Sequence, residues 1–421
     1  MTSEAKSAAA PDFAALDAIT DAVESGAGLP DVVRAAARAL DASLVLVDRT
    51  GAVLAVAARS PADERSLTAD GIGVETVELR VGDEPVGLLR MRVRNADGAG
   101  SGLVKLVTTL VASEVERLRA PQRASQEAAA AFVHAVLDRV LVGAEEIHER
   151  AVEVGIDLEL GASVLVARAH PQVPVEDGWR LRVLAVVERG ARAATTTAVA
   201  VPASPARGEG PAAEVIVLVP GDDDADAQRA AESVLRELQA GLPGHTFAVG
   251  RSRVALDATD LARAGNEALL AANVAEGDHD RSLIAFDATG AYRLLLPAMS
   301  EDPAELQRFY AETVEPLVAY DDQYETDLVA TVEAFLDADG NVAGTAQRLF
   351  THRHTIRYRL ERVRDLSGLD VGSTDGREKL SLGLKAMRVL GIAKRGGPAT
   401  EDGAGGGRVP RRKEGPTAAT S

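Results

Sequence analysis

Hydrophobic residues recur at helical spacing on both sides of a short break near the C-terminus. The apolar positions before the break are Val342, Ala346 and Leu349, and those after it are Ile356, Leu360 and Val363. This spacing places each set on one buried face of a helix. The pattern predicts two short helices within residues 341–364, joined by a tight turn at Phe350 and Thr351.

Side chains that can cap both helices lie at the expected places. Asn341 directly precedes the first apolar set, and Thr351 precedes the second. The side-chain oxygen of Asn or Thr accepts a hydrogen bond from a free backbone N–H in the first turn of a helix. We therefore expect Asn341 and Thr351 to be the two N-caps.

Upstream, residues 12–120 carry a mixed pattern of helices and strands. Helices are predicted from Leu16, at 31–40 and at 103–118, and strands at 43–48, 53–57, 76–80 and 86–93. A turn around Asp48 and Gly51 joins the first two strands. This order resembles a GAF or PAS sensor domain. An α+β dimerisation domain without a ligand is the alternative.

Residues 150–295 alternate between strands and helices, after an alanine-rich linker helix at 121–149. Strands are predicted at 164–168, 197–201, 214–219 and 246–250, and helices at 179–189, 225–238 and 256–274. Alternation of this kind predicts an α/β sandwich with helices packed on a sheet. The pattern resembles a nucleotide-cyclase-like (GGDEF-like) domain.

An enzyme of that type needs carboxylates at strand ends to hold Mg²⁺ against a triphosphate. Between the second and third predicted strands the chain reads PASPARGEGPAA, which offers one acid. Residues 222–224 are successive aspartates, and we interpret them as the acidic start of a helix because they cannot all face one ion. We therefore expect no catalytic residue, no metal and no cofactor.

The C-terminal part of the chain is predicted to be helical. Further helices are expected at 303–318, 324–338 and 377–390, so that residues 300–393 form an all-α domain. The ends, 1–11 and 394–421, are expected to be flexible, the latter because it is rich in Gly and Pro. The fold class is thus multidomain α+β: an α+β sensor-like domain, a central α/β sandwich and a C-terminal all-α domain.

Charge changes the interpretation of residues 341–364. The chain of 421 residues has a formal net charge of −18, whereas this segment holds six arginines and one acid, Glu361. Positive charge concentrated in an acidic protein indicates a localised phosphate-binding surface. The second helix, held by the first, can present forked donors to bases and phosphates in a DNA major groove. A solvated, arginine-rich helix is the alternative.

The candidate DNA-contacting residues lie on and next to the second helix. They are Thr351, Arg353, His354, Thr355, Arg357, Tyr358, Arg359 and Arg362. Arg353, His354, Arg357 and Tyr358 share the face opposite the apolar stripe, and we assign them to base reading and phosphate positioning. Arg359 and Arg362 flank the stripe and are interpreted as phosphate contacts or as partners within the domain.

Other features exclude whole classes of chemistry. The chain has no cysteine, which excludes disulfides, thiolate zinc sites and cysteine nucleophiles. No stretch approaches the roughly 18 continuous apolar residues of a membrane span, and the N-terminus lacks the pattern of a signal peptide. We expect a soluble, cytoplasmic protein with no membrane partner.

The C-terminal motifs resemble the PucR/CdaR family of bacterial transcription regulators. The residues that carry the resemblance are 327–336 (DLVATVEAFL), Gly340, Asn341, Ala346, 352–360 (HRHTIRYRL) and 367–370 (SGLD). The resemblance extends over about residues 120–393 and implies a degenerate, non-catalytic GGDEF-like middle domain. It also implies a regulator that binds double-stranded DNA at an operator and responds to a small-molecule effector of unknown identity.

One position departs from the family pattern. Family members commonly carry Asn where this chain has His354. Histidine can donate or accept at a base edge, but it cannot make the bidentate amide contact that Asn makes to adenine. The preferred DNA sequence of the family is therefore not carried over to this chain.

The sequence therefore predicts a ligand-responsive DNA-binding regulator rather than an enzyme. A single helix-turn-helix contacts few base pairs, so we expect a homodimer or higher oligomer that binds paired half-sites. The rival from another class is a nucleotide cyclase or nucleotide-binding signalling enzyme that uses the central domain. A third interpretation is a scaffold whose helix-turn-helix binds a protein.

Overall fold

The computed structural model describes most of the chain. The described residues are 13–69, 71, 73–93, 101–175, 178–204, 212–278, 280–300 and 303–392. The predicted flexible ends, 1–11 and 394–421, lie outside them, as does Glu209, the one acid of the segment PASPARGEGPAA. The chain divides into two compact units, residues 1–130 with 176–185 (unit 1) and residues 131–175 with 186–421 (unit 2).

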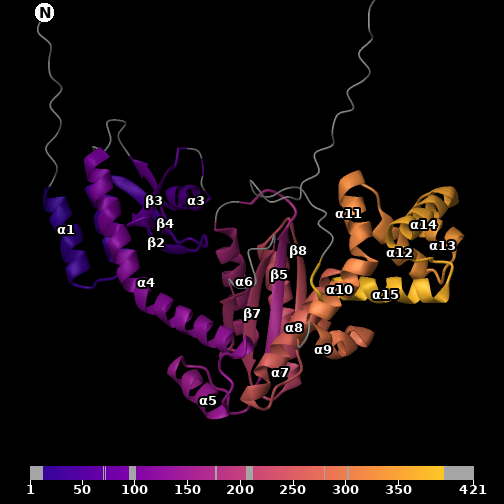
Figure 1. Cartoon of the computed structure of the whole chain (residues 1–421). Helices are drawn as coiled ribbons and strands as arrows, with labels where there is room; N and C mark the ends of the chain where they lie inside the picture. The colour runs from indigo at the N-terminus through magenta and orange to yellow at the C-terminus, as the bar shows by residue number, and fades with distance from the viewer. Residues whose placement is uncertain are drawn as a thin grey trace, which may run out of the picture. The chain divides into compact units, whose positions relative to one another are not determined.

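Unit 1 is built on a four-stranded antiparallel sheet with helices on both faces (Figure 1). Its elements are α1 (Phe13–Glu24), α2 (Leu29–Ala39), β1 (Ala42–Val47), β2 (Val53–Ala57), α3 (Pro61–Thr68), β3 (Glu75–Val81), β4 (Glu84–Val93) and the long helix α4 (Ser101–Leu137), which continues into unit 2. The strand order is β2-β1-β4-β3. The predicted strands are all present, whereas α3 was not predicted.

The turn between β1 and β2 is fixed by one carboxylate. Asp48 Oδ1 accepts hydrogen bonds from Thr50 N at 2.8 Å and from Ala52 N at 2.8 Å. Gly51 has φ +88°, a conformation that suits glycine because it lacks a Cβ. The predicted strand–turn–strand around Asp48 is therefore confirmed.

The central strand β1 is buried on both faces. Leu44 and Leu46 belong to the main core with α2 and α4, whereas Val45 and Val47 pack with Leu67 of α3. Two arginines of β4 hold α3 in place: Arg90 donates to the Thr68 carbonyl at 2.7 Å, and Arg92 lies 3.1 Å from Asp63. Apolar packing and hydrogen bonds therefore hold α3 on the sheet.

Unit 2 begins with a five-stranded sheet. Its strands are β5 (Ala162–Pro171), β6 (Val199–Pro202), β7 (Ala213–Pro220), β8 (His245–Arg251) and β9 (Leu283–Ala285), in the order β6-β7-β5-β8-β9. The β8–β9 pair is parallel and the other pairs are antiparallel. The accompanying helices are α5 (Ala144–Glu153), α6 (Trp179–Ala194, which begins in unit 1), α7 (Asp224–Gly241), η2 (Ala258–Asp260) and α8 (Leu261–Glu276). The predicted α/β sandwich is confirmed.

Small residues allow α8 to pack closely on the sheet. A Cβ at Gly250 of β8 would clash with the backbone of Ala268 and Ala272. The alanine-rich sequence of α8 and this glycine thus belong to one contact, in which helix and strand approach almost backbone to backbone.

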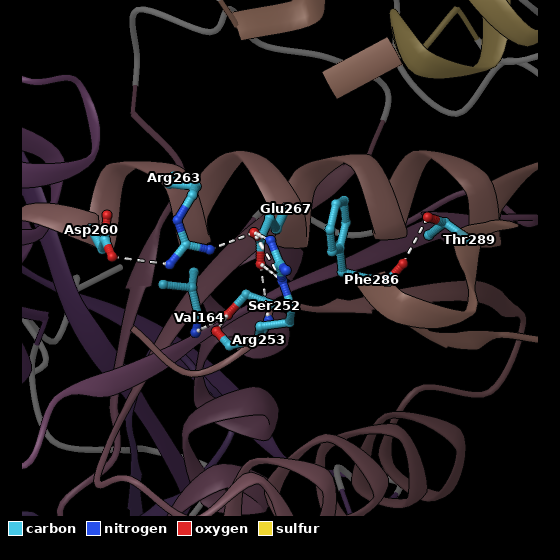
Figure 2. Close-up of polar contacts among 8 residues, drawn as sticks. All are labelled: Val164, Ser252, Arg253, Asp260, Arg263, Glu267, Phe286 and Thr289. Atoms are coloured by element: carbon cyan, nitrogen blue, oxygen red, sulfur yellow. Dashed lines mark hydrogen bonds and ion pairs between the residues drawn. The ribbon is translucent and has the colours of Figure 1, made fainter. Parts of the chain in front are cut away.

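A buried carboxylate ties the end of β8 to α8 (Figure 2). Glu267 of α8 is fully buried and accepts hydrogen bonds from the Arg253 backbone N–H at 3.1 Å and from Arg263 Nη1 at 2.5 Å. The Arg253 guanidinium also pairs with Glu267 and lies 5.0 Å from the centroid of the Phe286 ring. A buried charge is tolerated only when it is paired in this way.

The C-terminal helices complete unit 2. They are η3 (Phe286–Leu295), α9 (Leu296–Ser300), α10 (Pro303–Thr313), α11 (Glu315–Tyr324), α12 (Leu328–Asp337), α13 (Val342–Arg348), α14 (Arg353–Ser367) and α15 (Thr374–Val389). Their apolar faces share one core with residues of α8 and β9. The sandwich and the helical part of unit 2 are thus packed together rather than joined by a bare linker.

Two predicted helix boundaries in this part were wrong. The single helix expected at 303–318 is broken after Thr313, because Pro316 lacks a backbone N–H and occupies the first turn of a new helix, α11. The helix expected from Tyr324 begins at Leu328. Asp321 fixes that start, because its carboxylate accepts the Leu328 N–H at 2.7 Å and the Val329 N–H at 3.0 Å.

Loss of the buried carboxylate is expected to destabilise unit 2. Glu267→Ala leaves Arg253 and Arg263 without their shared partner, and because both arginines are partly exposed the cost is about 2–3 kcal/mol. Thermal unfolding followed by circular dichroism measures the change. The matched control is Glu305→Ala, which breaks an exposed pair with Arg308 and should cost below about 1 kcal/mol. Equal midpoints for the two variants would contradict this role of Glu267.

Candidate nucleic-acid interface

Helices α12, α13 and α14 pack against one another and form the helix-turn-helix (Figure 1). Asn341 caps α13 as predicted, since its side-chain oxygen accepts the N–H groups of Ala343 at 3.0 Å and Gly344 at 3.2 Å. Thr345 and Ala346 are the buried residues of this helix. The first of the two predicted helices is therefore confirmed.

The turn between α13 and α14 differs from the prediction in its cap. Phe350 takes a left-handed conformation with φ +49°, and the Thr351 N–H donates to the Ala346 carbonyl at 2.9 Å. Thr351 therefore still belongs to the end of α13. The N-cap of α14 is His352, whose Nδ1 accepts the His354 N–H at 3.3 Å. The prediction that Thr351 caps the second helix was wrong.

One stripe of α14 is buried in the shared core. Ile356 and Val363 are fully buried, Leu360 is buried, and Leu349 of the preceding turn packs against the same cluster. These are the residues that the periodicity assigned to the core. The opposite face of α14 is therefore the one presented to solvent.

Five of the eight predicted contact residues are exposed at the N-terminal half of α14. They are Arg353, His354, Thr355, Arg357 and Tyr358. Within the described residues, Arg353 and Arg357 form no side-chain hydrogen bond or ion pair, so both guanidinium groups are free to meet a ligand. The rings of His352 and His354 stack with centroids 5.0 Å apart.

The other three predicted contact residues lie differently. Thr351 is half-buried in the turn. Arg359 donates to Thr331 Oγ1 at 3.3 Å and lies 3.2 Å from an Asp327 oxygen, both near the start of α12. Arg362 lies over the Tyr320 ring of α11, 4.8 Å from its centroid, and a hydrogen bond with Tyr320 raises the pKa of Arg362. These two arginines fasten α14 to its neighbours.

The electrostatics of the exposed end favour an anion. The first turn of α14 contains no acidic residue, and the N-terminus of a helix carries partial positive charge. Arg353 and Arg357 add two full charges on the same half of the helix. The combination suits a phosphate backbone with base edges beside it.

Sequence reasoning missed one residue of this surface. Phe350 was interpreted as a break in the pattern, yet its side chain is 98% exposed at the turn that leads into α14. The signal that could have identified it is its residue type: a large aromatic in a turn between two short helices has no apolar face of its own helix to join.

The aspartates of the central sandwich are used in local structure. Asp223 caps α7 by accepting the Ala225 N–H at 2.8 Å, and Asp224 pairs with Arg251. Their interpretation as a helix start is therefore confirmed. Among the described residues, no three His, Asp or Glu side chains gather closely enough to hold a metal ion.

Unit 2 also contains a cavity of about 480 Å³. It lies where the end of α4, α5, the start of α8 and α9 meet. Apolar side chains such as Val136, Ile147 and Leu296 line it together with Arg139 and Asn266. Its size and mixed lining are in the range of small-molecule sites.

None of the helices in the described part of the chain has the length and apolar character that crossing a bilayer requires.

Comparison with known protein families agrees with this geometry. Residues 328–386, which span α12 to α15, match the PucR C-terminal helix-turn-helix domain, and residues 138–274 match the GGDEF-like domain. Together the two matches support a PucR/CdaR-type regulator. The PucR-type helix-turn-helix thus includes the exposed face of α14, and the GGDEF-like domain is the sandwich of unit 2.

Individual relatives match over shorter stretches. The purine catabolism regulatory protein of Bacillus subtilis is 31% identical over 86 residues, 20% of this chain and 16% of that protein. The DNA-binding transcriptional activator AdeR of the same species is 25% identical over 127 residues, 30% of each chain. The chain thus covers less than a third of the length of these relatives. The crystal structure of a regulator of polyketide synthase expression from Bifidobacterium adolescentis aligns with 61% of this chain and 91% of its own at 15% identity and a TM-score of 0.29.

Burial of the apolar stripe can be tested directly. Leu360→Asp places a charge in the shared core without a partner and should destabilise unit 2 by about 3 kcal/mol or more. The control is Tyr358→Asp on the same helix, where the side chain is 65% exposed and the midpoint should barely move. Thermal unfolding by circular dichroism compares them, and a native midpoint for Leu360→Asp would refute the core assignment.

Proposed function

We propose that the protein is a sequence-specific transcriptional regulator that binds double-stranded DNA through α14. The observation that carries this proposal is the pair of unpartnered arginines, Arg353 and Arg357, on the exposed half of a helix whose opposite stripe is buried. A PucR-type helix-turn-helix match over the same residues supports it. Relatives named as a regulatory protein and as a DNA-binding activator support it as well.

In this mechanism the N-terminal half of α14 enters the major groove. Arg353 or Arg357 can fork onto the O6 and N7 atoms of guanine, and His354 and Tyr358 reach neighbouring base edges or phosphates. The net charge of −18 on the whole chain repels DNA elsewhere, which favours one defined contact over general adhesion.

Arg359 and Arg362 act differently in this proposal. Since Arg359 is tied to Asp327 and Arg362 to Tyr320, they set the orientation of α14 on α12 and α11. A phosphate contact would require each to share its guanidinium between that partner and the DNA. Their main role is therefore positioning.

We propose a homodimer or higher oligomer as the DNA-binding species. A single helix-turn-helix contacts too few base pairs to select a site in a genome, and two-fold symmetric pairing doubles the site.

Residues 12–120 are proposed as a GAF-like sensor for a small-molecule effector. The alternative for unit 1 is a dimerisation domain without a ligand.

We propose that the GGDEF-like domain is non-catalytic. The one acid in PASPARGEGPAA and the structural roles of Asp223 and Asp224 support this. Incubation of the protein with GTP and Mg²⁺ tests it. Formation of a cyclic nucleotide product would contradict the proposal.

Arg357→Ala is expected to weaken binding to a DNA site selected by the wild-type protein from a random library. The expected cost is about 1–3 kcal/mol, with relaxed preference at one base pair, if the arginine forks onto guanine. Fluorescence anisotropy and repeated selection measure the two effects. The control is Arg308→Ala on α10, which removes the same charge from an exposed site in unit 2. Equal affinity and an unchanged preferred sequence would exclude Arg357 from base reading.

Salt dependence separates DNA binding from the scaffold alternative. A protein that neutralises phosphates releases counterions, so its affinity for DNA falls steeply and log-linearly with salt concentration. Removal of a phosphate-contacting arginine should reduce that slope by about one. A slope near zero for the wild-type protein would favour a protein partner for α14.

A further inference from the structure

Phe350 is unusual in two independent ways. Its side chain is 98% exposed, more than any other large apolar side chain in the described part of the chain. Its backbone has φ +49°, in the left-handed region that β-carbon sterics disfavour for residues other than glycine. Both features cost free energy in the isolated protein, and the turn needs the left-handed backbone but not a phenylalanine side chain.

The same domain makes left-handed turns with polar residues and with glycine. Glu325 after α11 has φ +54° and Asp339 after α12 has φ +53°, so among the described non-glycine residues with left-handed φ Phe350 is the apolar one. Helix α12 is followed by Gly340 with φ +79°, and α14 by Gly368 with φ +72°. Glycine is the common residue where a helix ends in a left-handed conformation. At the end of α13 the chain instead carries a phenylalanine, with the Phe350 N–H donating to the Gln347 carbonyl at 3.3 Å.

The position of the ring explains what it can meet. Phe350 is separated from the first residue of α14 by Thr351 and His352 alone, and the exposed cations Arg353 and Arg357 follow. A partner that comes to this surface must therefore carry negative charge and also offer an apolar group beside it. In a DNA major groove that apolar group is the 5-methyl group of thymine.

We propose that Phe350 is a specificity-determining DNA contact that packs on a thymine methyl group at the edge of each half-site. The inference rests on the proposed DNA-binding function and adds to it a preference that charge alone cannot give. In the free protein the left-handed backbone of Phe350 keeps the ring exposed, and the ring is buried only when the operator binds.

Phe350→Gly tests the contact without breaking the turn. Glycine accepts the left-handed conformation, so the melting temperature should stay the same or rise. Affinity for the site selected by the wild-type protein should fall about tenfold, which corresponds to loss of apolar contact area. The salt dependence should not change, because no charge is removed. Phe350→Leu keeps an apolar side chain and should recover part of the affinity.

Uracil in place of thymine supplies the second arm of the experiment, because it removes only the methyl group. Wild-type protein should lose affinity when one particular thymine of each half-site is replaced, and Phe350→Gly should be indifferent to that same replacement. This double substitution assigns the methyl contact to one side chain.

Three outcomes overturn the inference and leave the proposed function standing. Phe350→Gly that binds the site as tightly as the wild-type protein shows that the ring makes no contact. Sensitivity to uracil that is equal in both proteins assigns the methyl group to another residue. Loss of oligomerisation in sedimentation with unchanged DNA affinity makes the ring a protein interface. If the wild-type protein itself enriches no DNA, the proposed function fails, and the inference fails with it.

Discussion

The structure of the helix-turn-helix depends on burial of one stripe of α14. Ile356, Leu360 and Val363 fill the core beneath this helix, and their burial turns the arginine-rich face outward. Hydrophobic packing therefore decides which cations are available for a ligand. Without that stripe, the same arginines would surround a solvated helix and present no defined surface.

Because of this packing, the six arginines of residues 341–364 differ in what they contact. Arg348, Arg359 and Arg362 are bound to Asp337, Asp327 and Tyr320, respectively, and hold α13 and α14 on their neighbours. Arg353, Arg357 and Arg364 are exposed and form no side-chain hydrogen bond or ion pair within the described residues. Polar contacts also join α15 to the sandwich. The Asn273 side chain of α8 donates to the Val389 carbonyl at 2.7 Å and accepts from Arg168 of β5 at 2.6 Å. These two hydrogen bonds connect β5 with the end of α15 through Asn273 of α8.

The sequence was informative where local rules decide the structure. Periodicity identified the buried stripe of α14 and every strand of the two sheets except the short β9, and residue type identified the Asn341 cap. It failed where distant contacts decide. Helix α12 starts at Leu328 because Asp321 of α11 caps it. The intradomain partner that the sequence allowed for Arg359 is Asp327, which only the helix packing reveals. The cap at His352 follows from the left-handed backbone of Phe350, which spacing alone does not reveal.

Selection from fragmented genomic DNA with the full-length protein tests the central claim most directly. The wild-type protein should be compared with an Arg353→Ala/Arg357→Ala double variant. An Arg308→Ala/Arg281→Ala variant, which removes the same charge from exposed ion pairs of unit 2, is the control. The account predicts that the wild-type and control proteins enrich one defined motif and that the α14 variant does not. Enrichment of the same motif by the α14 variant would contradict it.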